Sequence, residues 1–212
     1  MVFDKTYLLS RYEAKKGAIK ARLAEFRKVL EKSDDDVFAE LCFCLLTPQS
    51  KAKMCDKAIQ RLKENGMLFS GKSDEIAKNL YGVRFPNNKS KYVEEARKSF
   101  CENGKIRIKD RLDADPYTLR ESLVKNIKGL GYKEASHFLR NVGLGEDLAI
   151  LDVHILKNLE RFKVIDEIPK TLTRKRYLEI EEKMKAFARE TGIPLAELDL
   201  LFWSEETGEI FK

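Results

Sequence analysis

A lysine and an aspartate separated by 19 positions could together carry out chemistry at a sugar carbon. Lys133 follows the turn Gly129-Leu130-Gly131, and Asp152 lies in the mostly apolar run 149–155. A neutral amine can add to an electrophilic carbon and form an imine. A fixed carboxylate can stabilise the positive charge that develops on a sugar when its glycosidic bond breaks. The start of a helix and a dry cleft would both favour the neutral amine.

Each of these residues, taken alone, also has an ordinary structural interpretation. Lys133 is one of many charged residues in a chain with 41 Lys and Arg. Asp152 would serve as the N-cap of a helix that carries Ile155 and Leu159, a role that is compatible with catalysis. His154 could contact a phosphate or a displaced base, although an isolated histidine is more often a helix-surface residue.

Two helices and a tight turn are needed to place Lys133. Apolar residues at helical spacing precede and follow the turn: Leu119, Leu123 and Ile127, then Ala135, Phe138 and Leu139. The glycines let the chain reverse and bring backbone N–H groups to the surface. With the start of the second helix, Gly129, Leu130 and Gly131 are predicted to bind one phosphate. A plain helix–helix corner would show the same local pattern.

Helical periodicity extends through the rest of the chain. It begins with Leu23, Phe26 and Leu30, and Asp34–Asp36 offers an acidic start for a second stretch that ends at Thr47-Pro48. Further helices are expected at about 51–64, 73–80, 87–102, 116–127, 132–142, 153–161, 174–190 and 195–204. The β-like piece 106–108 is too short to found a sheet. The predicted fold class is all-α.

Composition and charge set broader limits. The chain is 43% apolar, which predicts a globular protein, and its net charge of +6 permits a polyanionic partner without requiring one. The four cysteines match no zinc-binding spacing, so no metal site is predicted. There is no secretory signal and no apolar run of membrane-spanning length. We therefore expect an intracellular protein, in the cytoplasm or nucleoid, with no membrane association.

The combination of these features resembles a known active-site signature. Gly129-x-Gly131-x-Lys133 followed by Asp152-Val153-His154 is similar to the motif of the helix-hairpin-helix/Gly-Pro-Asp DNA glycosylases. Ile150-Leu151 stands where relatives often have Gly-Pro or Pro-Val. The resemblance implies that Lys133 is a nucleophile in a bifunctional glycosylase with lyase activity, assisted by Asp152. The alternative is a non-catalytic helix-hairpin-helix DNA-binding protein, which would not require the Lys133–Asp152 pair.

The resemblance also implies an architecture. Residues 1–212 are expected to form a single helix-hairpin-helix glycosylase unit of two helical lobes, with the hairpin at about 116–142. No cysteine lies after Cys101, so the C-terminal iron–sulfur cluster of the endonuclease III and adenine-glycosylase branches is not expected. The implied enzyme uses no cofactor, acts as a monomer and binds double-stranded DNA that contains a damaged base.

The C-terminal segment carries a second resemblance, which concerns the kind of damaged base that is removed. The segment Leu198–Trp203 and the nine residues that lead to Lys212 are similar to the compact, archaeal-type 8-oxoguanine DNA glycosylase/AP lyases. The segments 40–48 and 166–169 are similar to that family too. The resemblance implies that Trp203 and Lys212 contact the damaged base. Taken alone, Trp203 would be a core residue and Lys212 a frayed tail. A related bifunctional glycosylase for another oxidised base is the alternative.

Removal of a base from the helical stack leaves a gap that a side chain should fill. Phe85 is the predicted wedge, with Arg84 beside it for the opposite strand, and Gln49 could supply hydrogen bonds near the gap. The structural alternatives are that Phe85 covers an edge of the core and that Gln49 caps a helix. Nearby lysines could add phosphate contacts or form a solvated face: Lys51, Lys53, Lys89 and Lys91.

Overall fold

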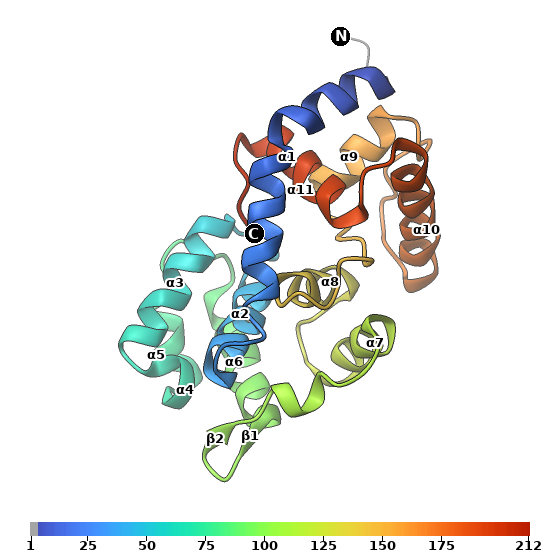
Figure 1. Ribbon diagram of the computed structural model, residues 1–212. Helices are drawn as coiled ribbons and strands as arrows, with labels where there is room; N and C mark the ends of the chain where they lie inside the picture. The colour runs from blue at the N-terminus through green and yellow to red at the C-terminus, as the bar shows by residue number, and fades with distance from the viewer. Residues whose placement is uncertain (1–3) are drawn as a thin grey trace.

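The structure, a computed structural model, describes residues 4–212, and helices dominate it (Figure 1). The helices are α1 (Lys5–Arg27), α2 (Asp34–Leu46), α3 (Ala52–Glu64), α4 (Met67–Ser70), α5 (Ser73–Lys78), α6 (Pro86–Phe100), α7 (Pro116–Asn126), α8 (Tyr132–Asn141), α9 (Val153–Arg161), α10 (Arg174–Thr191) and α11 (Leu195–Thr207). The predicted all-α class is confirmed. None of the helices within residues 4–212 has the length and apolar character needed to cross a bilayer.

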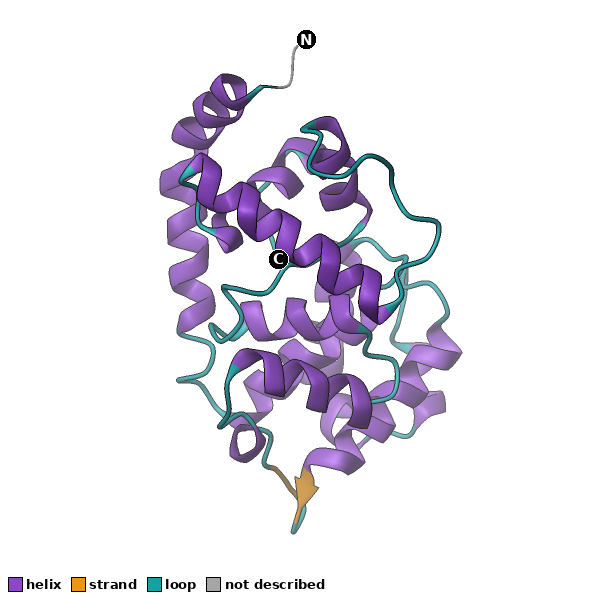
Figure 2. Cartoon of the chain, turned by 90° about the vertical axis from the view of Figure 1, so that its right-hand side faces the viewer, coloured by secondary structure: helices purple, strands orange, loops and turns teal. Residues whose placement is uncertain are grey.

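Three local predictions were wrong in detail. α1 ends at Arg27, so Leu30 packs against the core from a turn instead of continuing the helix. The segment 65–71, which lies between the helices expected at 51–64 and 73–80, contains the single-turn helix α4. The β-like piece contributes only Ile106: strands β1 (Cys101–Glu102) and β2 (Lys105–Ile106) pair antiparallel, with Cys101 opposite Ile106. This small hairpin lies at one end of the molecule (Figure 2).

Two clusters of buried apolar side chains define two helical lobes. The first cluster is built mainly from α2 to α8 and includes Phe38, Leu45 and Phe138. The second is built from α1 and α9 to α11 and includes Leu23 and Phe202. In Figure 1, α8 lies between the two groups of helices, and α1 runs from one group to the other. The predicted two-lobed arrangement is therefore present.

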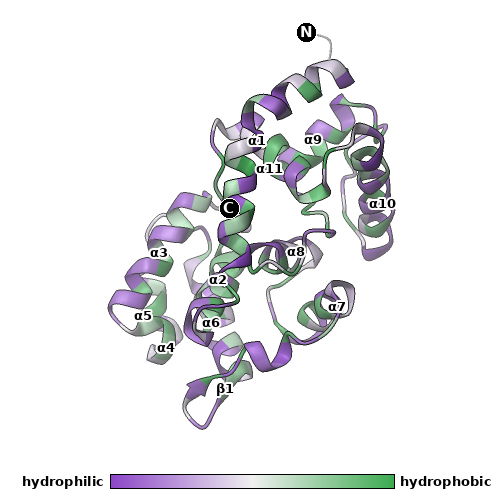
Figure 3. Cartoon of the chain, viewed as in Figure 1, coloured by the Kyte–Doolittle hydropathy of each residue, from purple (hydrophilic) through white to green (hydrophobic). Residues whose placement is uncertain are grey.

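Helix α11 occupies the centre of the second lobe. Every position from Leu195 to Phe202 is buried, whereas the neighbouring α10 keeps an exposed polar face. Figure 3 shows the same contrast, with α11 largely hydrophobic and α10 largely hydrophilic. A helix that is buried on all sides brings even its charged residues into the interior. Asp199 is one of these buried charged residues.

Candidate active site

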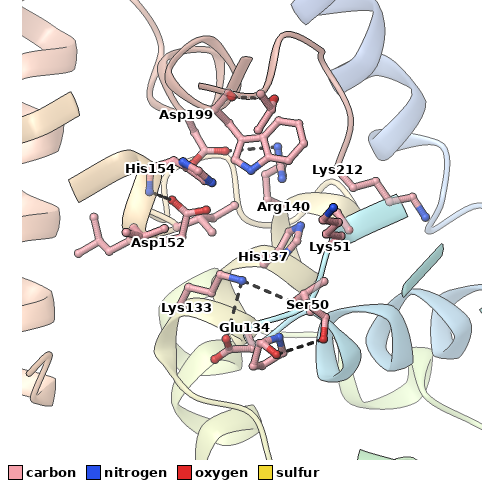
Figure 4. Close-up of a pocket in the computed structure, with 18 of the residues that line it drawn as sticks. Ser50, Lys51, Lys133, Glu134, His137, Arg140, Asp152, His154, Asp199 and Lys212 are labelled. Carbon is pink, nitrogen blue, oxygen red and sulfur yellow. Dashed lines mark hydrogen bonds and ion pairs between the residues drawn. The ribbon is translucent and has the colours of Figure 1, made fainter. Parts of the chain in front are cut away.

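A cavity of about 930 Å³ lies between the two lobes. Its wall is formed by the turn after α2, by α8, by the segment that leads into α9, and by α11 with the C-terminal tail. Figure 4 shows Lys133 opposite Asp152 and His154 in this region, with Lys212 at its edge and the Lys212 amine pointing away from them. Six of the predicted site residues line the cavity: Gln49, Lys133, Asp152, His154, Trp203 and Lys212.

Lys133 stands in the first turn of α8, as predicted. Its Nζ lies 3.5 Å from Thr47 Oγ1 and 3.8 Å from Glu134 Oε1, so no close ion pair fixes the amine. About one fifth of its side chain is exposed, and that part faces the cavity. Glu134 is held in turn by the hairpin, because its Oε2 accepts a hydrogen bond from Gly131 N–H. The amine therefore lies in the cavity wall without a close ionic partner.

Asp152 is the N-cap of α9, which confirms its predicted structural role. Its Oδ1 accepts hydrogen bonds from the backbone N–H groups of His154 and Ile155, each at 2.8 Å. Both of these bonds use one oxygen, so the other can face the cavity that the residue lines. Capping and access to the cavity are therefore compatible in this geometry.

A buried network connects the helix of Lys133 to the segment before Asp152. The Arg120 guanidinium, on α7, donates to both carboxylate oxygens of Glu181 and to Ser136 Oγ on α8. Glu181 also accepts the N–H of Ala149, and Tyr177 Oη donates to the carbonyl of Ala149. Both members of the Arg120–Glu181 pair have side chains only 2% exposed. A buried bidentate ion pair of this kind fixes the relative positions of the elements it joins.

The hairpin turn adopts a conformation that requires glycine at Gly129. This residue has φ +93°, and a Cβ added there would lie 2.5 Å from the ring of Tyr92. Leu130 is buried in the first core, and its N–H donates to the carbonyl of Ile127. Since the N–H of Gly131 is bonded to Glu134, the donors left for a phosphate are those of Gly129 and the first turn of α8. Leu130 therefore serves as an anchor for the turn, and its side chain does not reach the surface as a contact for DNA.

His154 lies beside a carboxylate at the edge of the cavity. Its Nδ1 is 3.9 Å from Glu206 Oε2, and one third of its side chain is exposed. Glu206 also forms an ion pair with Arg161 and accepts a hydrogen bond from Asn158. Glu206 is therefore the acidic neighbour of the His154 imidazole.

The C-terminal tail is anchored, so the alternative of a frayed end was wrong. Lys212 Nζ lies 3.0 Å from both Glu40 Oε2 and Asp56 Oδ1, and 4.6 Å from the centre of the Phe43 ring. Burial opposes the charge of Lys212, but these two carboxylates outweigh it and raise the pKa of the amine. Trp203 is half-buried on α11 and lines the same cavity.

The predicted gap-filling residues lie at two strained turns that contact each other. Gln49 and Phe85 both have positive φ, +55° and +59°, which is uncommon for residues other than glycine. The N–H of Arg84 donates to Ser50 Oγ, which joins the two turns. Phe85 is 49% exposed and lies against the Arg84 guanidinium. Neither alternative holds, because Phe85 does not cover the core and the N-cap of α3 is Lys51.

Arg84 and Phe85 do not line the cavity itself, in contrast to Gln49. Lys89, which was a candidate for phosphate contact, is buried. Its ammonium group donates to the carbonyls of Leu46 and Pro48 and to Ser50 Oγ, so it fixes the Gln49 turn instead of reaching solvent.

Comparison with known proteins decides which family this arrangement represents. The family model described as 8-oxoguanine DNA glycosylase matches residues 19–193. The chain belongs to the 8-oxoguanine DNA glycosylase family. A relative in this family from Fusobacterium nucleatum subsp. nucleatum, named 8-oxoguanine DNA glycosylase/AP lyase, is 51% identical over 204 residues, covering 95% of this chain and 94% of the relative.

Solved structures of 8-oxoguanine DNA glycosylases have the same fold. The Thermotoga maritima enzyme superposes with a TM-score of 0.87 at 36% identity, covering 98% of both chains. The Methanocaldococcus jannaschii 8-oxoguanine glycosylase/lyase, in complex with a 15mer DNA that contains 8-oxoguanine, superposes with a TM-score of 0.86 at 38% identity. That match covers 97% of this chain and 100% of the M. jannaschii chain.

The four cysteines of this 8-oxoguanine DNA glycosylase family member differ in their exposure. Cys42, Cys44 and Cys55 are buried free thiols, and Cys101 is exposed. Burial raises the pKa of Cys55 to about 11, which keeps that thiol protonated. Nowhere within residues 4–212 do three His, Cys, Asp or Glu side chains gather in a way that could hold a metal ion.

Sequence reasoning missed three buried ionisable residues that line the cavity. His137 and Arg140 stand four and seven positions after Lys133, so they share its face of α8. Asp199 precedes Trp203 by four positions on α11 and therefore shares the face of that residue. Helical spacing from residues already selected could have indicated that all three share a face with a site residue, although it does not indicate that they are buried.

Asp199 should make the stability of the protein depend on pH. Burial raises its pKa from 3.8 to about 7, and Arg140 only partly opposes this shift. Because the folded-state pKa exceeds the unfolded-state value, the folded protein binds the proton more tightly. The stabilisation is therefore complete below about pH 4 and is lost as the pH rises to about 7.

We expect this pH dependence to disappear in Asp199→Asn. Between pH 4 and pH 8, the free energy of unfolding of the wild type should fall relative to that of the variant by roughly 4 kcal/mol, three pKa units at about 1.4 kcal/mol each. Denaturant titrations at several pH values measure this difference. Parallel stability curves for the two proteins would show that Asp199 titrates normally.

Proposed function

We propose that this protein removes 8-oxoguanine from double-stranded DNA and then nicks the strand at the resulting site. The main support is the convergence of the Lys133 amine and the Asp152 carboxylate on one cavity between the lobes. The cavity has the volume of a typical small-molecule site. The relatives named 8-oxoguanine DNA glycosylase/AP lyase, and the neighbour in complex with 8-oxoguanine DNA, favour this substrate.

The proposed reaction begins when the damaged nucleotide leaves the stack and enters the cavity. As the bond between C1′ and the base breaks, the electron pair leaves with the base, which takes up a proton. Lys133 Nζ forms a new bond to C1′, and Asp152 stabilises the positive charge that develops on the sugar. Loss of protons from the amine and opening of the sugar ring leave an imine between Lys133 and C1′.

The imine then allows strand cleavage. It acidifies the C2′ position, so removal of a C2′ proton drives the electrons toward the imine and expels the 3′ phosphate by β-elimination. Hydrolysis of the remaining imine returns the Lys133 amine. The step needs no metal ion or organic cofactor, because the imine that Lys133 forms with C1′ is itself the electron sink.

We further propose how the remaining predicted residues contribute. Trp203 would pack against the displaced base, and Lys212 would lie at its edge. Phe85 would fill the gap in the duplex. Arg84 would lie toward the opposite strand, and Gln49 would lie between the gap and the cavity.

The free N–H groups near Gly129 would bind a backbone phosphate, and His154 would make a second phosphate contact. Because both lobes line the cavity, residues 1–212 would work as one unit, and we expect a monomer.

A panel of duplexes tests the substrate. Each duplex carries one lesion, and strand cleavage is followed under single-turnover conditions with the wild-type protein. We expect 8-oxoguanine to be processed at least about tenfold faster than thymine glycol, because a site that hydrogen-bonds one base leaves unpaired polar groups with another. Faster cleavage of thymine glycol would instead support a glycosylase for oxidised pyrimidines.

A further inference from the structure

Lys89 is a buried cation that the proposed reaction does not use. It is 4% exposed, and its ammonium group donates to three neutral oxygens: the carbonyls of Leu46 and Pro48, each at 2.7 Å, and Ser50 Oγ at 2.9 Å. Burial lowers the pKa of Lys89, because a charge is costly to remove from water. Three charge-assisted bonds nevertheless hold the ammonium group in place, so Lys89 is a rigid link to the oxygens that it binds.

The side-chain bonds of Lys89 fix the turn that carries Gln49. Gln49 has φ +55°, and a residue other than glycine keeps such a conformation only when its surroundings impose it. Lys89 binds the residue on each side of Gln49, at the carbonyl of Pro48 and at Ser50 Oγ. Ser50 itself lines the cavity (Figure 4). The bonds from Lys89 therefore oppose relaxation of this turn to an ordinary backbone conformation.

Lys89 is joined to the second strained turn as well. Phe85, with φ +59°, is the N-cap of α6, and the backbone N–H of Lys89 donates to the carbonyl of Phe85. Arg84 is connected through Ser50, whose Oγ accepts both the N–H of Arg84 and the ammonium group of Lys89. One residue thus connects, through its backbone and its side chain, the two turns that carry Gln49, Arg84 and Phe85.

The gap left by a displaced base requires side chains in defined places. Unstacking and unpairing a base is costly, and side chains offset that cost best when they are held in their bound positions beforehand. We propose that Lys89 is a positioning residue: it holds the turns of Gln49 and Phe85 in a fixed relation, so that both side chains fit the gap in the duplex. This inference rests on the proposed function, which gives Gln49 and Phe85 their places in the DNA.

Two substrates separate gap filling from the chemistry at C1′. One duplex carries 8-oxoguanine opposite cytosine, and the other carries an abasic site opposite cytosine, from which no base has to be displaced. At the abasic site, the Lys133 amine adds to the C1′ aldehyde with loss of water, and the same imine then leads to strand nicking. A residue that positions the gap-filling side chains should matter for the first substrate and much less for the second.

Lys89→Met is the direct test, with both rates measured under single-turnover conditions. Methionine is similar in length but has no donor, so the variant loses all three side-chain bonds. We expect release of 8-oxoguanine to slow at least about tenfold, as loss of hydrogen bonds to a charged group implies, while nicking of the abasic site changes less than about threefold. Ser50→Ala removes only the shared acceptor and should show the same selectivity with a smaller loss. It tests the inference even if Lys89→Met does not fold.

Arg97→Met is the matched control. Arg97 stands on the same helix as Lys89 and also donates to three backbone carbonyls, which lie in and just after α4 and do not line the cavity. Its variant should keep the wild-type rates on both substrates. The inference is overturned if Lys89→Met and Ser50→Ala slow both substrates by the same factor, as a purely structural role would, or if neither slows the release of 8-oxoguanine. Failure of the wild type to release 8-oxoguanine would contradict the proposed function itself.

Discussion

Lys133→Gln is expected to abolish the covalent adduct that borohydride traps between the wild-type protein and a duplex containing 8-oxoguanine. Borohydride reduces an imine to a stable amine, so the adduct reports the bond between Lys133 and C1′. Glutamine has similar length but no nucleophilic nitrogen. Strand nicking should fall by at least about a thousandfold, as expected when a covalent nucleophile is removed. Adduct formation is measured by gel shift under denaturing conditions.

Lys125→Gln is the matched control for this experiment. Lys125 is an exposed lysine near the end of α7, in the same hairpin but outside the cavity. Its variant should form the adduct at the wild-type level. If the Lys133→Gln protein still cross-links, another amine is the nucleophile, and Lys212 or Lys51, which also line the cavity, would be the next to replace.

The sequence indicated Lys133 and Asp152 as a pair through its resemblance to the glycosylase signature, and local structure places each of them. Lys133 follows directly from the glycine turn, and Asp152 from its position as an N-cap. Their meeting in one cavity could not be read from spacing alone. It depends on the Arg120–Glu181 network, which joins α7, α8 and α10 and contains residues 61 positions apart in the chain.

The burial of Arg140 and Asp199 could not be predicted from the sequence pattern. Charged residues on helices are usually solvated, and nothing near Asp199 in the chain indicates that α11 is enclosed on all sides. The prediction for Lys89 was wrong for the same reason. A lysine in a basic stretch is expected to be exposed, but the ammonium group of Lys89 donates to the carbonyls of Leu46 and Pro48. Burial of a charge is decided by the packing of distant elements, and periodicity within one helix does not report it.

The helices themselves were predictable because their apolar faces and caps are local. Asp115, Asp152 and Thr173 all accept hydrogen bonds from the first turn of the helix that follows. Helix ends without such a signal were less accurate: Leu30 continues the apolar spacing of α1 although the helix has already ended at Arg27. The spacing of apolar residues indicates which side chains are buried. It does not show whether a residue is helical, because a side chain in a turn can also pack against the core.

Asp152→Asn is expected to slow the release of 8-oxoguanine by about 10²-fold to 10³-fold while DNA binding stays within a few-fold of wild type. The carboxylate opposes the charge that develops on the sugar only as the glycosidic bond breaks, so its loss affects the transition state more than the bound state. Asparagine is itself a good N-cap, so the free energy of unfolding should change by less than about 1 kcal/mol. Single-turnover rates, binding titrations and denaturant unfolding measure the three quantities.

Asp115→Asn separates capping from catalysis. Asp115 is the N-cap of α7 and accepts from the N–H groups of Tyr117 and Thr118, the same geometry that Asp152 has at α9, but it lies outside the cavity. Both variants lose a capping charge, yet only Asp152→Asn removes a carboxylate that faces the sugar. Equal slowing by the two variants, or parallel loss of binding and rate in Asp152→Asn, would mean that the carboxylate acts through the helix start and not on the reacting bond.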